Sequence, residues 1–132
     1  MMQTAAALRY QQVQAHTSSP GELLIALYDG LFRFLNGARA FLERGEKARA
    51  GELLSRAYSV VSELYIALDH DVNPELCANL ESVYGFCMDK ITFANLKGSP
   101  EVVDEVIRVL TPLREAWAVA VVEAQKEKAR GR

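Results

Sequence analysis

The sequence predicts an all-α protein, an antiparallel up-down four-helix bundle preceded by a short mobile N-terminal helical segment. Apolar residues recur at helical spacing through four long stretches of the 132-residue chain. Capping residues, prolines and glycines separate these stretches, and the connections are short, so successive helices must run antiparallel. No strand pattern competes with this interpretation, and the length suits a single domain.

The first helix is expected to begin at Ser19-Pro20-Gly21-Glu22. Ser19 can accept a hydrogen bond from the Glu22 amide, and proline suits the first helical position. The helix should end near Arg44, because Gly45 can adopt the left-handed conformation of a helix stop. Its core-facing stripe is predicted to be Leu23, Leu27, Leu31, Phe34, Leu35, Ala38 and Leu42.

The second helix is expected to run from about Glu46 to Asp69, and the third from Pro74 to Gly98. Between them, Asn73 is placed to cap the third helix. The core stripe of the second helix is predicted to be Leu54, Ala57, Tyr58, Val61, Leu64, Tyr65 and Leu68. That of the third is Cys77, Leu80, Tyr84, Cys87, Met88, Ile91 and Ala94.

The fourth helix is expected to open at Ser99-Pro100-Glu101. Pro112 lies inside it, where a proline removes one amide and costs about 3 kcal/mol unless the helix bends. We expect a kink there, although Thr111 could instead cap a fresh helix. The predicted core residues are Val102, Val103, Val106, Leu110, Leu113, Trp117, Ala120 and Val121.

The chain thus divides into three parts: a mobile segment over residues 1–18, the bundle over 19–125, and a basic tail over 126–132 that is expected to fray. Bulk properties exclude several function classes. The net charge is -2, from 15 basic and 17 acidic residues, which gives no reason to expect nucleic acid. No apolar run approaches about 18 residues, so no membrane insertion is expected. No signal peptide is visible, and a cytoplasmic location follows.

The sequence contains no recognisable catalytic or metal site. Cys77 and Cys87 would lie ~15 Å apart on one helix, too far to form a disulfide, so both are expected to be reduced. The two histidines, His16 and His70, do not follow a glutamate at the spacing of a di-iron bundle. No base is placed beside a nucleophile. We therefore expect no enzyme, no metal and no cofactor.

Several apolar residues fall on the side of a helix opposite to its core stripe. At 100° per residue, Ile25 and Phe32 point outward on the first helix with Tyr28 beside them, and Phe86 and Phe93 do so on the third. Single exposed hydrophobic residues are ordinary, but aromatic residues at heptad spacing favour a partner-binding surface. The alternatives are burial by the N-terminal segment or a dimer. The candidate partner-binding residues are Tyr10, Val13, Ile25, Tyr28, Phe32, Phe86 and Phe93.

The order and spacing of five motifs resemble FliS, the family of flagellin-specific export chaperones. The motifs are Tyr10-Gln11-Gln12, Thr17-Ser18-Ser19-Pro20-Gly21-Glu22-Leu23, Leu27-Tyr28-Asp29-Gly30, Ala94-Asn95-Leu96 and Leu113-Arg114-Glu115-Ala116-Trp117. The resemblance covers about Tyr10 to Val122. The sequence departs from the family pattern at Ala15, Gly85, Asp89-Lys90 and Pro112. These departures affect individual contacts rather than the class of protein.

The resemblance implies a bundle that holds the disordered C-terminal region of flagellin in the cytoplasm. Such binding prevents premature polymerisation and assists delivery to the flagellar type III export gate. In the family, the flagellin tail wraps the bundle, and the N-terminal segment covers part of that surface when the partner is absent. The alternative is a self-associating helical bundle that acts as a structural or dimerisation module. The free protein is expected to be a monomer or a weak homodimer.

Overall fold

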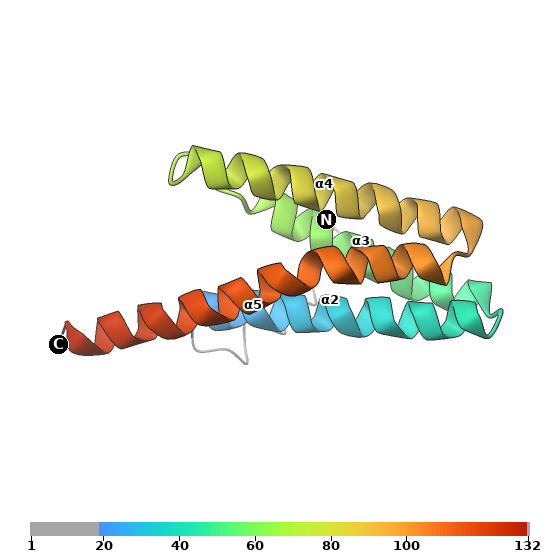
Figure 1. The fold of residues 1–132 in the computed structure, drawn as a ribbon, viewed down its shortest axis with the longest axis horizontal. Helices are drawn as coiled ribbons and strands as arrows, with labels where there is room; N and C mark the ends of the chain where they lie inside the picture. Colours follow the sequence, from blue (N-terminus) through green and yellow to red (C-terminus); the bar gives the residue numbers. More distant parts are fainter. Residues whose placement is uncertain (1–18, 132) are drawn as a thin grey trace, which may run out of the picture.

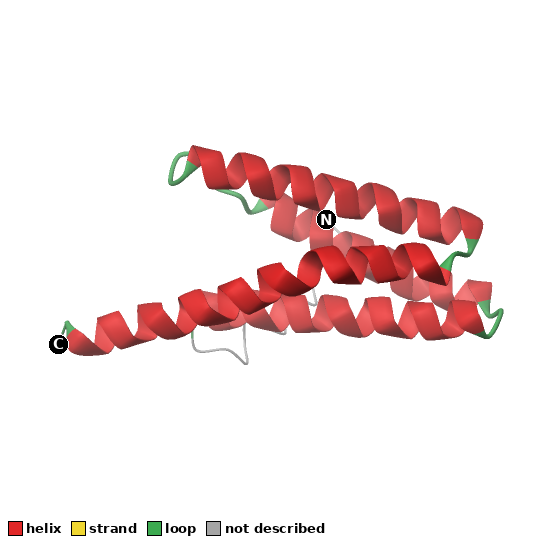
Figure 2. Ribbon diagram, viewed as in Figure 1, coloured by secondary structure: helices red, strands yellow, loops and turns green. Residues whose placement is uncertain are grey.

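The computed structural model describes residues 19–131 and contains four helices: α2 (Pro20–Glu43), α3 (Lys47–Ile66), α4 (Pro74–Lys97) and α5 (Pro100–Arg130). They form an antiparallel bundle in up-down order (Figure 1). Within the described residues, short loops join the helices and no strand is present (Figure 2). The predicted four-helix bundle is confirmed. The predicted mobile segment, residues 1–18, lies outside the described residues.

Side-chain caps start three of the helices, as the sequence predicted. The Ser19 hydroxyl accepts from the Glu22 amide at 3.1 Å, and the Asn73 side chain accepts from the Leu76 amide at 3.1 Å. Ser99 does the same for α5, at 3.3 Å from the Val102 amide. A proline follows each cap and fits the first helical turn.

Glycines end two of the helices. Gly45 has a φ of 77° and Gly98 a φ of 65°, both in the left-handed region that favours glycine. α3 lacks a side-chain cap and ends at Ile66, three residues before the predicted Asp69. The residues from Ala67 to Asn73 form the turn into α4.

Each helix packs along its two neighbours in the ring α2–α3–α4–α5. The predicted core stripes of α2 and α4 are correct apart from Met88, which is only partly buried. On α3, the prediction that Tyr58 lies in the core is wrong, because its side chain is 42% exposed. Val60, which was not predicted, is buried instead. Tyr58 lies at the edge of α3 where no helix of the described chain covers it.

α5 is one continuous helix through Pro112, so the alternative of a fresh helix capped by Thr111 is wrong. The Thr111 hydroxyl donates to the Ile107 carbonyl at 2.7 Å. Figure 1 shows that α5 changes direction along its length and that its C-terminal part extends past the rest of the bundle. This bend agrees with the expected proline kink.

The C-terminal turns of α5 also differ from expectation. Residues 126–130 are exposed but helical, whereas the sequence predicted a frayed tail. Lys126 pairs with Glu123 at 3.8 Å, and Lys128 and Arg130 suit the negative end of the helix dipole. These local interactions favour continuation of the helix without tertiary contacts. None of the described helices is both long and apolar enough to cross a membrane.

Candidate functional site

The C-terminal half of α5 packs along the beginning of α2, and this contact is unusually close at Gly21. A Cβ atom built on Gly21 would lie 2.9 Å from Cγ2 of Val121. The missing side chain therefore lets the two helices approach at this point. Two grooves flank the contact, one on each side of Val121.

The first, here called the Trp117 groove, has a volume of about 380 Å³. Its walls are mostly apolar, and the polar side chains among them are Ser19, Gln125 and Lys128. The lining residues are Ser19, Pro20, Gly21, Leu24, Trp117, Ala120, Val121, Ala124, Gln125 and Lys128. An apolar groove between two helices can accept the apolar face of a third helix.

The second, here called the Arg114 groove, has a volume of about 460 Å³. Its lining residues are Glu22, Ile25, Ala26, Asp29, Arg114, Ala118, Val121, Val122 and Gln125. Arg114 donates to both carboxylate oxygens of Asp29, at 3.0 and 3.2 Å, and this pairing raises the pKa of Arg114. This planar Arg114–Asp29 ion pair connects α5 to α2 just after Pro112.

A hydrogen-bonded aromatic cluster lies behind the Trp117 groove. The hydroxyls of Tyr28 and Tyr84 are 2.6 Å apart, and Nε1 of Trp117 donates to the Tyr28 hydroxyl at 3.2 Å. Burial raises the pKa of both tyrosines, so both stay neutral. Nearby, burial raises the pKa of the Cys87 thiol to about 12. Such a thiol is inert, which suits packing rather than catalysis.

Aromatic side chains also line the exposed side of α4. Phe86 is 41% exposed and Phe93 is 46% exposed. Between them, Nζ of Lys90 lies 5.6 Å from the centroid of the Phe86 ring and 6.0 Å from that of Phe93. Lys90 also pairs with Glu105 of α5 at 3.3 Å. We call Phe86, Lys90 and Phe93 the α4 strip.

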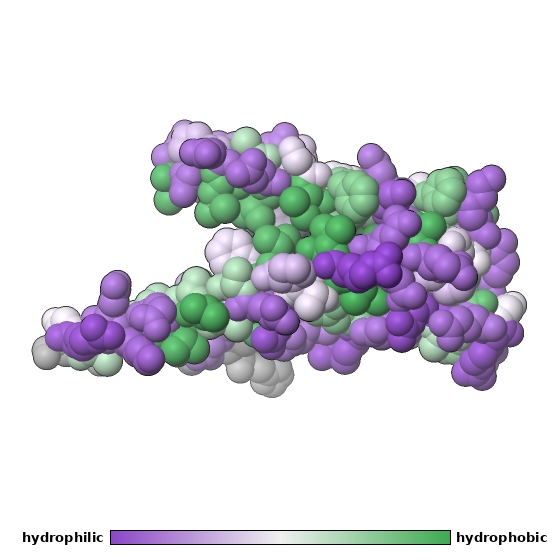
Figure 3. Space-filling view, viewed as in Figure 1, coloured by the Kyte–Doolittle hydropathy of each residue, from purple (hydrophilic) through white to green (hydrophobic). Residues whose placement is uncertain are grey.

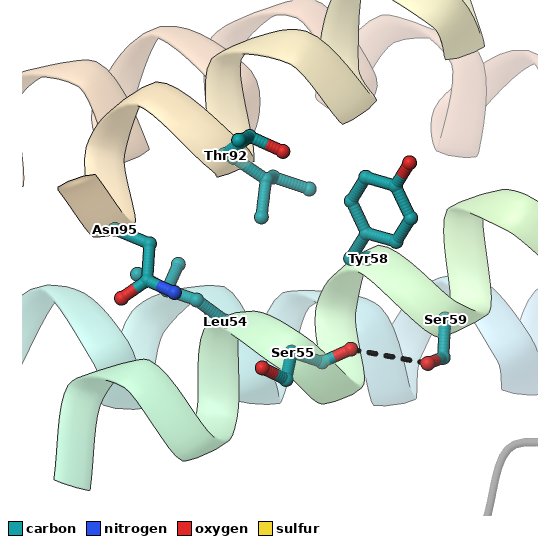
Figure 4. Close-up of a pocket in the computed structure, with 7 residues that line it drawn as sticks. Leu54, Ser55, Tyr58, Ser59, Thr92 and Asn95 are labelled. Atoms are coloured by element: carbon teal, nitrogen blue, oxygen red, sulfur yellow. Dashed lines mark hydrogen bonds between the residues drawn. The ribbon is translucent and has the colours of Figure 1, made fainter. Parts of the chain in front are cut away.

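A pocket of about 370 Å³ with both polar and apolar lining residues lies between α3 and α4 (Figure 4). It is lined by Leu54, Ser55, Tyr58, Ser59, Ile91, Thr92 and Asn95. Figure 4 shows Tyr58 of α3 and Thr92 of α4 on facing walls. The Ser59 hydroxyl donates its hydrogen to the Ser55 carbonyl at 3.1 Å. Of the seven lining residues, Tyr58 alone carries an ionisable side chain.

The surface is hollowed on one side of the molecule. Figure 3 shows this hollow between the C-terminal part of α5 and the α3–α4 hairpin, with hydrophobic residues along its walls. Ile66, Val72 and Leu76, around the turn of that hairpin, are all exposed. Within residues 19–131, no group of three histidine, cysteine or acidic residues could hold a metal ion.

The structure separates the predicted binding residues. Ile25 lines the Arg114 groove, and the exposure of Phe86 and Phe93 is confirmed. Phe32 is half-buried against the core. The prediction that Tyr28 faces outward is wrong, because Tyr28 is 0% exposed and bonds inside the bundle. Tyr10 and Val13 lie outside the described residues.

Sequence reasoning placed Trp117, Ala120 and Val121 in the core and so missed the grooves that they line. The structure leaves Trp117 and Val121 half-buried and Ala120 exposed. The signal that could have found the grooves was length: α5 has 31 residues, whereas α2 has 24 and α3 has 20. An apolar stripe that continues beyond its partner helices has nothing in the bundle to cover it.

Comparison with known proteins agrees with the motif order. The profile of a family described as "Flagellar protein FliS" matches residues 1–125. The "Flagellar secretion chaperone FliS" of Bacillus subtilis (strain 168) is 30% identical over 119 residues, covering 90% of this chain and 88% of that protein. The protein of the same name from Salmonella typhimurium is 33% identical over 122 residues, covering 88% and 90%. A solved structure described as a flagellar chaperone from bacteria has the same fold, with a TM-score of 0.74, 22% identity and coverage of 89% and 96%.

Proposed function

Because this chain belongs to the FliS family of flagellar proteins, we propose that it is a flagellar export chaperone that binds the disordered C-terminal region of flagellin. Its named relatives are secretion chaperones. The family is one of chaperones rather than enzymes, as the sequence analysis expected. The observation that carries the proposal is the pair of grooves beside the α2–α5 contact, which the described chain leaves open.

The grooves suit a partner that brings apolar side chains on a helix. The Trp117 groove is lined by leucine, alanine, valine and the indole, and these can exclude water from an apolar helix face. Ile25 and Val122 add apolar surface on the other side, beside the Asp29–Arg114 pair. A disordered tail loses conformational entropy when it orders, so it needs several contact areas to bind usefully.

The α4 strip supplies a further contact area in this proposal. Phe86 and Phe93 belong to a different helix from either wall of the grooves. A tail that reaches both regions must wrap around the bundle. Wrapping would keep the flagellin tail from polymerising in the cytoplasm and present it to an export gate protein.

The N-terminal segment is proposed to cover the groove when flagellin is absent. The proposal is supported by the position of Ser19, the first described residue, which lines the Trp117 groove. Tyr10 and Val13 are the proposed anchors. If the segment covers the groove most of the time, the apparent affinity falls with the open fraction. Deletion of residues 2–15 should then speed association with little change in the melting temperature, whereas slower association would show that the segment binds the partner.

The central experiment is titration calorimetry with the C-terminal segment of the cognate flagellin. We expect saturable one-to-one binding and a negative heat-capacity change, because apolar surface is buried. Ala120→Glu places a charge in the Trp117 groove and should weaken binding about tenfold or more. Ala48→Glu is the matched control, since Ala48 is also an exposed helical alanine but lies in the first turn of α3, away from both grooves.

Two results would contradict the proposal. One is the absence of both binding heat and co-elution with the tail at tens of micromolar. The other is equal weakening by Ala120→Glu and by its control. Gel filtration with and without the tail tests the alternative of a self-associating bundle. A monomer or weak homodimer that forms a one-to-one complex with the tail supports the chaperone function. A stable oligomer that does not bind the tail supports the self-associating bundle.

A further inference from the structure

The cluster of Tyr28, Tyr84 and Trp117 joins three helices at one point. Tyr28 comes from α2, Tyr84 from α4 and Trp117 from α5, and the Tyr28 hydroxyl bonds to both of the others. Since α2 and α4 are not neighbours in the ring, the bond between the two tyrosines crosses the centre of the bundle. The two tyrosines are 0% and 2% exposed, whereas Trp117 is half-buried and forms a wall of the Trp117 groove. The indole therefore belongs both to the polar cluster and to the groove.

A count of hydrogens shows that Tyr28 is the centre of the cluster. The two hydroxyls and the indole N–H supply three donor hydrogens, and the cluster contains two hydrogen bonds. Tyr28 takes part in both bonds, and the Trp117 N–H donates to its hydroxyl. Without the Tyr28 hydroxyl, the N–H would have to turn toward the Tyr84 hydroxyl or toward water, and the groove is where Trp117 meets solvent.

From this geometry we propose that Tyr28 and Tyr84 are positioning residues that hold the Trp117 indole in the orientation that keeps the Trp117 groove open. The inference rests on the proposed function, because it gives the groove its role in binding the flagellin tail. Tyr28 acts by accepting from the indole, and Tyr84 acts by fixing the Tyr28 hydroxyl from the opposite helix. An indole released from the cluster populates orientations that intrude into the groove, and the competent fraction of the protein falls.

The test compares Tyr28→Phe and Tyr84→Phe with Tyr65→Phe as a matched control. Tyr65 is a half-buried tyrosine on α3 that lines neither groove. Trp117 is the sole tryptophan, so time-resolved fluorescence anisotropy reports its motion alone. In the free protein, Tyr28→Phe should add fast local motion of the indole, Tyr84→Phe should add less, and the control should match the wild type.

Tail affinity should follow the same order. We expect Tyr28→Phe to bind the flagellin tail about tenfold more weakly than wild type, Tyr84→Phe a few-fold more weakly, and the control equally. A purely structural role would lower the melting temperature while leaving indole motion and affinity unchanged, and that result would overturn the inference. Changed motion with unchanged affinity would also overturn it, because the groove would then not depend on the indole.

The measurements separate this inference from the proposed function. The anisotropy comparison needs no tail, so it decides whether the tyrosines hold the indole even if the wild-type protein fails to bind flagellin. Failure of the wild type to bind would overturn the proposed function. If Tyr28→Phe does not fold, Tyr84→Phe tests the inference instead. It leaves the Trp117–Tyr28 bond in place and removes only the hydrogen bond between Tyr84 of α4 and Tyr28.

Discussion

Tyr28 lies where three helices meet, and its hydroxyl satisfies two other polar groups in a buried place. Tyr28→Phe removes both hydrogen bonds of the cluster and leaves the buried Tyr84 hydroxyl without its partner, whereas Tyr84→Phe removes one bond and leaves the Trp117–Tyr28 bond in place. A buried donor without an acceptor costs about 1–3 kcal/mol. Tyr28→Phe should therefore reduce the free energy of unfolding by about that amount more than Tyr84→Phe, as measured by urea denaturation.

The double variant makes this prediction sharper. With phenylalanine at positions 28 and 84, the buried Tyr84 hydroxyl that Tyr28→Phe leaves without its partner is also removed. Adding Tyr84→Phe to Tyr28→Phe should restore part of the lost stability, even though it removes another hydroxyl. Additive losses from the two substitutions would show that the two hydroxyls act independently and would contradict this prediction.

At the scale of elements, the packing of α5 on α2 depends on Gly21. Gly21→Ala places a methyl group 2.9 Å from Val121, so α5 must shift or Val121 must change rotamer. We expect a loss of about 1–3 kcal/mol in the free energy of unfolding, measured by thermal or urea denaturation. Gly85→Ala is the control, because a Cβ there meets nothing within 4 Å. It should stabilise α4 by about 0.5–1 kcal/mol.

Trimming the opposing side chain provides a second check on the same contact. In the Gly21→Ala background, Val121→Ala removes the atoms that the new methyl group would meet. Val121→Ala should therefore lower the free energy of unfolding less in this background than in the wild type. Equal costs in the two backgrounds would show that the α2–α5 contact is not limited by steric overlap at this point.

The exposed side of α4 should tolerate change better than the core. Phe86→Ser and Phe93→Ser should each alter the free energy of unfolding by only about 0.5 kcal/mol, because neither ring belongs to the buried core. Each should weaken binding of the flagellin tail by about 1 kcal/mol or more if the α4 strip is a contact. Ala48→Ser, at an exposed position in the first turn of α3, should leave binding unchanged. Unchanged binding in both phenylalanine variants would remove the strip from the proposed surface.

At the scale of the whole molecule, the free energy of unfolding should fall at alkaline pH, because the fold buries two tyrosines and a cysteine in their neutral forms. The folded state raises the pKa of Tyr28, Tyr84 and Cys87, whose ordinary values are 10.0 for tyrosine and 9.0 for the thiol. These groups keep their protons longer when folded than when unfolded, so unfolding releases protons at high pH. Their contribution to stability is complete below about pH 9 and is lost as pH rises above it.

Urea denaturation between pH 7 and pH 11 checks this dependence. The free energy of unfolding should fall steadily above about pH 9 to 10, and Cys87 should react with a thiol reagent only when the chain unfolds. Cys87→Ala should reduce the slope in the lower part of that range. A flat profile up to pH 11 would mean that these groups titrate in the folded protein as they do in the unfolded chain.

The sequence by itself determined where α2, α4 and α5 begin and where α2 and α4 end, because caps at Ser19, Asn73 and Ser99 and stops at Gly45 and Gly98 act through nearby backbone groups. It also determined the core-facing side of α2 and α4, since helical periodicity is a local property. The order and spacing of the motifs were enough to indicate the correct family, because they depend on the sequence alone.

Only the tertiary structure decided which of the remaining apolar residues are covered. Tyr28 became buried because Tyr84 and Trp117 arrive from helices distant in the sequence, and Tyr58 stayed exposed because no described helix lies over its edge. The grooves exist because α5 bends and continues past its neighbours, and because Gly21 lets it lie close to α2. Periodicity shows which residues share one side of a helix, but coverage depends on the lengths, angles and positions of the other helices.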